Sequence, residues 1–193
     1  LWIDAGWGMA LDSEVRGATL AAARAFEQVG AIVEPLPPFT PRAMIDGLDA
    51  FWRMRAWQDI AAWPKERQAQ VLRYIFQWAE GAAALSAEQV FRGHAQMAAI
   101  RDATVAATQR FDFVLSPVSP MVSFPAEFAS PLNDPARPFE HIAFTLPFNM
   151  SEQPAIALNA GYTASGFPIG VQLAGRRHDD LGVLRLARAF EQM

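Results

Sequence analysis

The sequence contains no cysteine and only one lysine, Lys65. The absence of cysteine excludes a disulfide framework, zinc–thiolate sites and a thiol nucleophile. No apolar run approaches the roughly 20 residues that a membrane-spanning helix needs. No run of like charges has the character of a polybasic membrane patch. The sequence therefore predicts neither thiol chemistry nor a membrane span.

An excess of positive charge is also missing. The 16 basic and 20 acidic residues give a formal net charge of −4, which argues against non-specific binding to nucleic acid. The 193 residues, 52% of them hydrophobic, suffice for one sizeable domain. The chain opens at Leu1 with no initiator Met and no signal-peptide pattern. We therefore expect a natural N-terminus further upstream, and we expect a cytoplasmic protein.

The first third of the chain has the pattern of a strand, a helix and a second strand. Residues 1–3 and 31–34 are short apolar runs, and apolar residues recur at helical spacing between them. Asp12 is a good N-cap residue, and Gly30 is suited to the end of the helix. A unit of this length predicts two parallel strands joined by a crossover helix.

The middle of the chain is predicted to be helical. Residues 42–62 form one helix, Pro64 interrupts it, and residues 65–80 form the next. A capping box at residues 86–89 opens a further helix that extends to about Arg110. The many Trp and Phe side chains of these helices either line a substrate pocket or pack the helices together, and the sequence leaves both alternatives open.

The last third returns to strands. Residues 111–115, 154–159 and 169–173 have strand character, and the small and polar residues 161–166 predict a hairpin between the last two. A closing helix follows Asp179, with Leu181, Leu184, Ala187 and Phe190 expected on one face. We predict an α/β fold in which a mixed β-sheet is flanked by helices, with residues 1–193 forming one unit.

The sequence contains no recognisable active site. None of the eight serines lies in a glycine-flanked nucleophile turn. The three histidines, His94, His141 and His178, lack metal-ligand spacing. There is no phosphate-binding loop and no dinucleotide fingerprint. We therefore assign no catalytic residue, no metal and no cofactor to these residues.

Three motifs in the last eighty residues occur in a fixed order. They are FDFVLSP at 111–117, PFNMSEQPAI at 147–156 and GFPIGVQLAGR at 166–176. This series resembles the C-terminal motifs of the amidase-signature family, and residues 1–34 resemble the strand–helix–strand segment that follows the family's signature. The resemblance implies that residues 1–193 are the C-terminal part of a single amidase-signature domain.

The resemblance implies hydrolysis of a carbon–nitrogen amide bond through a serine acyl-enzyme, without a metal or cofactor. The family's Ser–Ser–Lys machinery comes from a Gly/Ser-rich signature and an upstream lysine, and neither matches these residues. We expect Lys65 to have no catalytic role and the chain alone to be inert. One alternative is a non-catalytic binding module that retains the fold. Another is an unrelated α/β hydrolase, which would place a serine against a histidine.

The resemblance also implies which residues line the acyl pocket. The segment from Ile142 to Asn149 and the helix around Gln77 and Trp78 would contribute this wall, which we predict to consist of Gln77, Trp78, Ile142, Phe144, Phe148 and Asn149. Glu152 replaces the usual glycine of the second motif, a variant that resembles one bacterial amidase subgroup. Residues 141–145 lack the acidic contact of the glutamyl-tRNA-amidating branch. A small, less polar amide is the expected substrate, and a homodimer is the assembly we consider.

Overall fold

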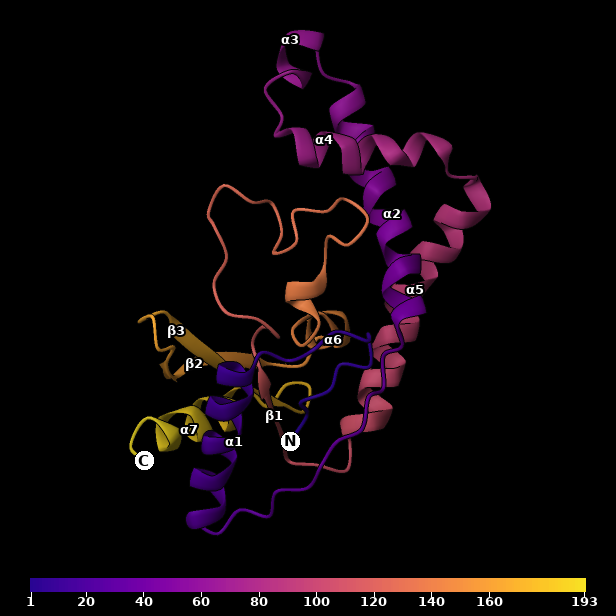
Figure 1. Cartoon of the computed structure of the whole chain (residues 1–193). Coiled ribbons are helices and arrows are strands. Elements are labelled where there is room, and N and C mark those ends of the chain that lie inside the picture. Colours follow the sequence, from indigo (N-terminus) through magenta and orange to yellow (C-terminus); the bar gives the residue numbers. More distant parts are fainter. The chain divides into compact units, whose positions relative to one another are not determined.

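A computed structural model describes residues 1–193 (Figure 1). Its residues separate into two units. Unit 1 comprises Leu1–Pro41, Ile100–Ser123 and His141–Met193, and unit 2 comprises Arg42–Ala99 and Phe124–Glu140. Each unit is therefore assembled from segments that lie far apart in the sequence.

Helix α1 (Ser13–Gln28) begins and ends where the sequence predicts. The Asp12 carboxylate accepts hydrogen bonds from the backbone N–H groups of Glu14 (2.8 Å) and Val15 (3.2 Å). These bonds satisfy two donors that a helix N-terminus leaves free. After the helix, Gly30 takes the left-handed conformation, with φ 94°, as glycine commonly does at this position.

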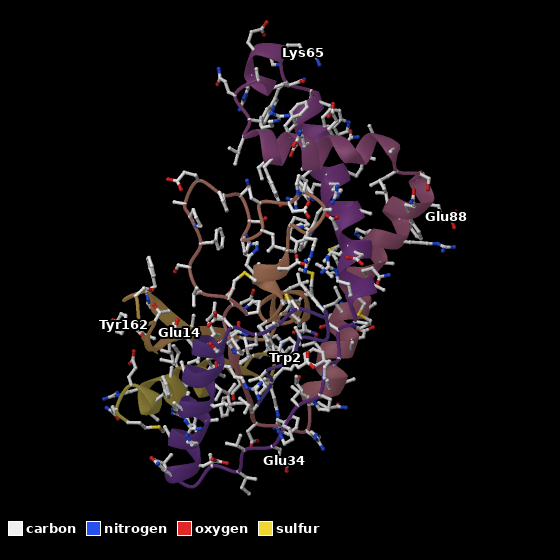
Figure 2. The ribbon with its side chains drawn as sticks, in the orientation of Figure 1. Trp2, Glu14, Glu34, Lys65, Glu88 and Tyr162 are labelled. Atoms are coloured by element: carbon white, nitrogen blue, oxygen red, sulfur yellow. The ribbon has the colours of Figure 1, made fainter.

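Three antiparallel strands form the sheet of unit 1. They are β1 (Phe113–Pro117), β2 (Ala155–Tyr162) and β3 (Pro168–Gly175), in the order β1-β3-β2. Strands β2 and β3 are the predicted hairpin. The Glu14 carboxylate, drawn beside Tyr162 in Figure 2, accepts a hydrogen bond of 2.6 Å from the backbone N–H of Ala164 at its tip. This bond joins the start of α1 to the hairpin turn.

The predicted parallel strands at residues 1–3 and 31–34 are not regular strands. Leu1 N donates to Glu34 O (2.7 Å) and Leu36 N donates to Leu1 O (2.9 Å), which is the pattern of a single parallel bridge. Trp2 N donates to Leu115 O of β1 (2.9 Å). The bridge does not continue because the prolines from residue 35 onward carry no N–H donor. The α/β prediction is confirmed, and the parallel part of the expected mixed sheet is reduced to this bridge.

Helices α1 and α7 (Asp180–Phe190) cover one face of the sheet (Figure 1). Their shared core consists of Ala22, Ala23, Phe26, Leu115, Val171, Leu173 and Ala187. The predicted apolar face of the closing helix is partly wrong, because Leu181 and Leu184 are 58% and 56% exposed. The buried side instead follows Val183, Ala187 and Phe190, whose spacing of four and three residues keeps to one helical face.

The opposite face of the sheet carries a short helix that the sequence did not predict, α6 (Leu146–Ser151). Its C-cap, Glu152, adopts a left-handed conformation with φ 59°. Buried Gln172 of β3 fixes the preceding segment by donating to Phe144 O (3.0 Å) and Ser116 Oγ (3.2 Å). These bonds meet the hydrogen-bonding needs of an amide group that would be costly to bury unpaired.

Unit 2 is helical. Its elements are α2 (Arg42–Ala61), α3 (Lys65–Gln68), α4 (Arg73–Glu80), the 3₁₀ helix η1 (Gly81–Ala84) and the first part of α5 (Ala87–Thr108), while the 3₁₀ helix η2 (Glu140–Ile142) begins at its last residue. The predicted single helix over 65–80 is wrong, because Leu72 is extended, with ψ 127°, and separates α3 from α4. The predicted capping box is confirmed. Gln89 N donates to Ser86 Oγ (3.2 Å), and Ser86 N donates to Gln89 Oε1 (2.8 Å).

Helices α2 and α5 approach each other closely at two glycines of unit 2. A Cβ atom added to Gly93 would lie 2.4 Å from the backbone oxygen of Gly47, so the two backbones could not keep this distance. We therefore expect Gly93→Ala to destabilise the chain by about 1–2 kcal/mol in urea unfolding, because overpacking outweighs the gain in helix propensity.

Gly17→Ala is the matched control for this substitution. Gly17 also lies within a helix, but a Cβ there meets no atom within 4 Å. The same exchange should then stabilise by roughly 0.5–1 kcal/mol. Equal effects at the two positions would contradict a close helix contact at Gly93.

Candidate substrate groove

An aromatic groove of about 360 Å³ lies in unit 2. Its walls are Trp52, Arg55, Ala56, Asp59, Trp78 and Phe139. Four of these residues come from α2 at spacings of three and four residues, so they share one face of that helix. Phe139 stands edge-on to Trp52 (ring centroids 4.9 Å, planes at 80°) and to Trp78 (5.9 Å, 90°). The three rings thus form one aromatic cluster, and we call the cavity that they line the aromatic groove.

Trp78 is held in position by Asp49. The indole Nε1 of Trp78 donates to Asp49 Oδ1 (2.8 Å), and Arg53 Nε donates to Asp49 Oδ2 (2.7 Å). Arg53 also donates through Nη2 to Pro135 O (2.8 Å). One carboxylate therefore links α2 and α4, and its arginine partner extends the link to the segment that carries Phe139.

Burial raises the pKa of the Asp49 carboxyl above its ordinary value, although hydrogen bonds from Trp78 and Arg53 oppose this shift. A carboxyl whose pKa is higher in the folded state contributes most to stability when it is protonated. That contribution is complete below the unfolded-state pKa and is lost as the pH rises through the folded-state pKa.

We therefore expect the wild type to lose stability relative to Asp49→Asn as the pH rises from about 4 to 7, so that the free energy of unfolding of the wild type minus that of the variant decreases. Urea unfolding of both proteins at each pH measures this difference, and the other carboxylates cancel in it. A difference that grows with pH would show that the Arg53 ion pair outweighs burial of the carboxylate.

The segment 124–140 is tied to α2 and α4 by buried polar groups. Glu140, with 3% of its side chain exposed, pairs with Arg42 Nη1 (2.6 Å) and Arg137 Nε (2.9 Å). Tyr74 Oη lies 2.9 Å from Ser130 Oγ and donates to Asp134 O (3.0 Å). These bonds fix the irregular segment that brings Phe139 to the aromatic groove.

Of the predicted pocket-wall residues in unit 2, Trp78 lines the aromatic groove, whereas Gln77 is exposed beside it in α4. The spacing of residues 52, 55, 56 and 59 on α2 was a signal in the sequence for one common helix face. Phe139 and Asp49 carried no such signal, because their contacts join segments that are distant along the chain. The pocket role of the predicted residues stays a prediction.

Two of the four predicted pocket-wall residues of unit 1, Phe144 and Phe148, pack against Trp2. Phe144 and Phe148 are 1% and 2% exposed. Their rings stand edge-on to the Trp2 ring at 4.9 Å and 6.0 Å between centroids. Ile142 is half-buried, and Asn149 is exposed on α6. The structure thus brings Phe144 and Phe148 together in an aromatic core.

The buried serines have partners that do not form a nucleophile–base pair. Ser116 Oγ donates to Pro117 O (3.0 Å), Ser130 pairs with Tyr74, and Ser151 Oγ donates to Gln153 Oε1 (2.9 Å). The exposed Lys65 at α3 donates to Gln68 Oε1 (3.2 Å) and is drawn in Figure 2. None of these partners is a base that could activate a serine hydroxyl.

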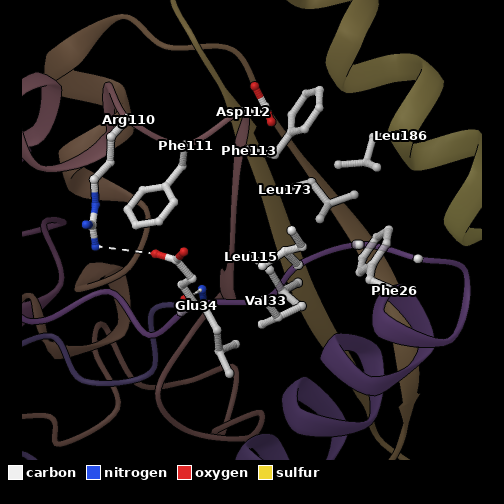
Figure 3. A pocket seen from close by; sticks show the side chains of 14 residues that line it. Phe26, Val33, Glu34, Arg110, Phe111, Asp112, Phe113, Leu115, Leu173 and Leu186 are labelled. Atoms are coloured by element: carbon white, nitrogen blue, oxygen red, sulfur yellow. Dashed lines mark hydrogen bonds and ion pairs between the residues drawn. The ribbon is translucent and has the colours of Figure 1, made fainter.

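A second pocket, of about 510 Å³, lies in unit 1 (Figure 3). Apolar side chains including Phe26, Leu173 and Leu186 line it, and Glu34 and Arg110 form an ion pair of 3.7 Å at its edge. Its lining contains no serine, histidine or lysine. The aromatic groove contains none of these residues either, but its Arg55 and Asp59 are unpaired beside three aromatic rings. The carboxylates of the second pocket are already paired, Glu34 with Arg110 and Asp112 with Arg176, so the aromatic groove is the better candidate binding site.

The acidic and histidine side chains form no cluster suited to a metal ion. No group of three or more His, Asp or Glu residues is placed to hold one. No helix combines the length and the apolar character that a bilayer crossing demands.

The fold is that of an amidase-signature enzyme. A bacterial aryl acylamidase of the amidase-signature enzymes superposes with a TM-score of 0.77 at 23% identity, over 99% of this chain and 42% of that one. The acylamidase of Rhodococcus erythropolis is 30% identical over 187 residues, which are 94% of this chain and 39% of that protein. A glutamyl-tRNA(Gln) amidotransferase subunit of Myxococcus xanthus (strain DK1622) is 29% identical over 209 residues, covering 94% of this chain and 42% of that subunit.

The family model Amidase matches residues 2–184, and the chain belongs to the amidase family. It spans about two fifths of the length of these two curated relatives. The resemblance inferred from the three sequence motifs is thereby confirmed.

Proposed function

We propose that this chain forms the substrate-binding, C-terminal part of an amidase that hydrolyses a carbon–nitrogen amide bond through a serine acyl-enzyme. The observation that carries the proposal is the family match over residues 2–184. The aromatic groove supports it, since this shallow hollow is lined mainly by aromatic side chains with a few polar groups, as sites for small molecules commonly are.

The same proposal makes the 193-residue chain inactive by itself. Acyl-enzyme formation needs a serine, a base within hydrogen-bond reach and donors for the oxyanion. The buried serines bond to a carbonyl, a phenol and an amide instead. The nucleophile and its base would then come from residues outside this chain.

The proposed substrate is a less polar amide than glutamine. The segment before α6 contains Ala143 and Phe144, both of which are buried, and Gln172 already binds the Phe144 carbonyl. Residues 141–145 thus offer no carboxylate that could bind the ammonium group of a glutamine substrate.

The alternative function is that of a binding module without catalysis. The lack of a nucleophile among the residues that line the aromatic groove favours this alternative.

The reading frame upstream of the Leu1 codon tests the proposal. A lysine codon followed by a Gly-Ser-Ser-Gly stretch is the expected result, because these residues would supply the missing Ser–Ser–Lys arrangement. An unrelated upstream sequence would overturn the enzyme proposal and support the binding module.

A further inference from the structure

The aromatic groove has features that specify its ligand more closely than "amide". Its walls present three aromatic rings, and the small Ala56 side chain lies between the polar residues of the α2 face. Arg55 and Asp59 are one helical turn apart and exposed, and no ion pair joins them. Both therefore remain available to a bound molecule.

We propose that the aromatic groove binds a neutral aryl amide, with the ring against Trp52, Trp78 and Phe139 and the amide group between Arg55 and Asp59. This inference names the substrate class of the proposed amidase and so rests on that proposed function.

The ring assignment follows from aromatic geometry. The edge-on contacts of Phe139 with Trp52 and Trp78 leave indole surface facing the groove. A flat aryl ring gains edge-to-face or offset contacts there that a saturated ring of equal size does not, worth about 0.5–1.5 kcal/mol for each aromatic pair. The groove is therefore selective for aromatic over aliphatic ligands.

The amide assignment follows from the two polar residues. The Arg55 guanidinium only donates hydrogen bonds, and the Asp59 carboxylate only accepts them when ionised. A secondary amide offers one acceptor and one donor, so it can satisfy both groups at once. A benzoate would meet the like charge of Asp59, and a benzylammonium would meet that of Arg55. The balanced charge of the pair thus favours a neutral ligand.

The groove is held open before a ligand arrives. Asp49 fixes the Trp78 indole through its Nε1 bond, and Arg53 spans to Pro135 O near Phe139. Walls that are already fixed lose little conformational freedom on binding, which increases affinity. Asp49 is a positioning residue in this arrangement, because it acts through Trp78.

Titration calorimetry of the 193-residue chain tests the proposal, with acetanilide as the probe. We expect saturable binding at one site, with N-cyclohexylacetamide, benzoate and benzylammonium each binding roughly tenfold more weakly. Trp52→Ala and Trp78→Ala should each weaken acetanilide binding at least tenfold. Trp63→Ala is the matched control, since Trp63 lies outside the groove and stacks under Arg67, and it should leave binding unchanged.

Two milder variants keep the test decisive if an alanine variant fails to fold. Trp78→Phe retains an aromatic wall but removes the Nε1 donor, and Asp59→Asn removes the negative charge while keeping the size of the side chain. Trp78→Phe should weaken acetanilide binding several-fold, and Asp59→Asn should remove the penalty against benzoate.

Absence of binding to a folded chain, or equal binding of acetanilide and its cyclohexyl analogue, would overturn the inference. An effect of Trp63→Ala equal to that of Trp78→Ala would also overturn it. A wrong amidase proposal gives a different result from a wrong ligand inference. If only the amidase proposal is wrong, acetanilide still binds to the groove, but a chain extended upstream through the reading frame hydrolyses no amide.

Discussion

Phe144→Ala is expected to destabilise the chain by roughly 3–5 kcal/mol. Phe144 is 1% exposed, and its ring packs edge-on against Trp2 at 4.9 Å. Truncation would leave a cavity beside a fully buried indole and remove an aromatic contact as well. Urea unfolding monitored by far-UV circular dichroism measures the change in the free energy of unfolding.

Asn149→Ala is the control from the same segment. Asn149 is exposed on α6, so its truncation should change stability by less than about 0.5 kcal/mol. Phe144 was predicted as a pocket-wall residue. A small effect of Phe144→Ala on stability would show that its ring faces a substrate cavity instead of supporting the core of unit 1.

Glu140→Ala is expected to cost about 2–3 kcal/mol of stability. Removal of one partner from a buried ion pair costs roughly 3–5 kcal/mol, because the remaining charge is left uncompensated. The value is smaller here because Arg42 and Arg137 are 31% and 47% exposed, and Arg42 keeps a second partner in Asp46 at 2.7 Å. Urea unfolding gives this change too, and it should coincide with weaker acetanilide binding, because Glu140 adjoins Phe139 in the chain.

Glu88→Ala provides the matched control for a glutamate in an ion pair. Glu88 pairs with Arg92 at 2.6 Å, but the two side chains are 69% and 76% exposed. Exposed pairs at this spacing contribute only about 0.3–0.5 kcal/mol. If Glu140→Ala and Glu88→Ala lower the free energy of unfolding equally, the ion pairs of Glu140 with Arg42 and Arg137 do not anchor the segment that carries Phe139.

The elements that the sequence predicted well are those with local signals. Asp12 and Gly30 bracket α1, and the capping box opens α5, because these residues bond to the backbone within a few positions. Helix α6 escaped prediction because its six residues are too few to show a helical period.

The aromatic groove could be predicted only in part. The α2 face at residues 52, 55, 56 and 59 follows from helical spacing. The approach of Phe139 depends on the buried Glu140 bonds, and the orientation of Trp78 depends on Asp49. Both depend on tertiary contacts, which no local pattern encodes. The three motifs of the last eighty residues did identify the family, because they occur in a fixed order and at fixed separations, and residues 1–34 extended the resemblance to the start of the chain.

Amide hydrolysis by the purified 193-residue chain tests most directly the claim that this chain binds substrate but contains no catalytic machinery. Release of aniline from acetanilide should equal that in buffer alone, with circular dichroism showing that the chain is folded. Hydrolysis above this background that disappears when one of the eight serines is replaced by alanine would contradict the claim.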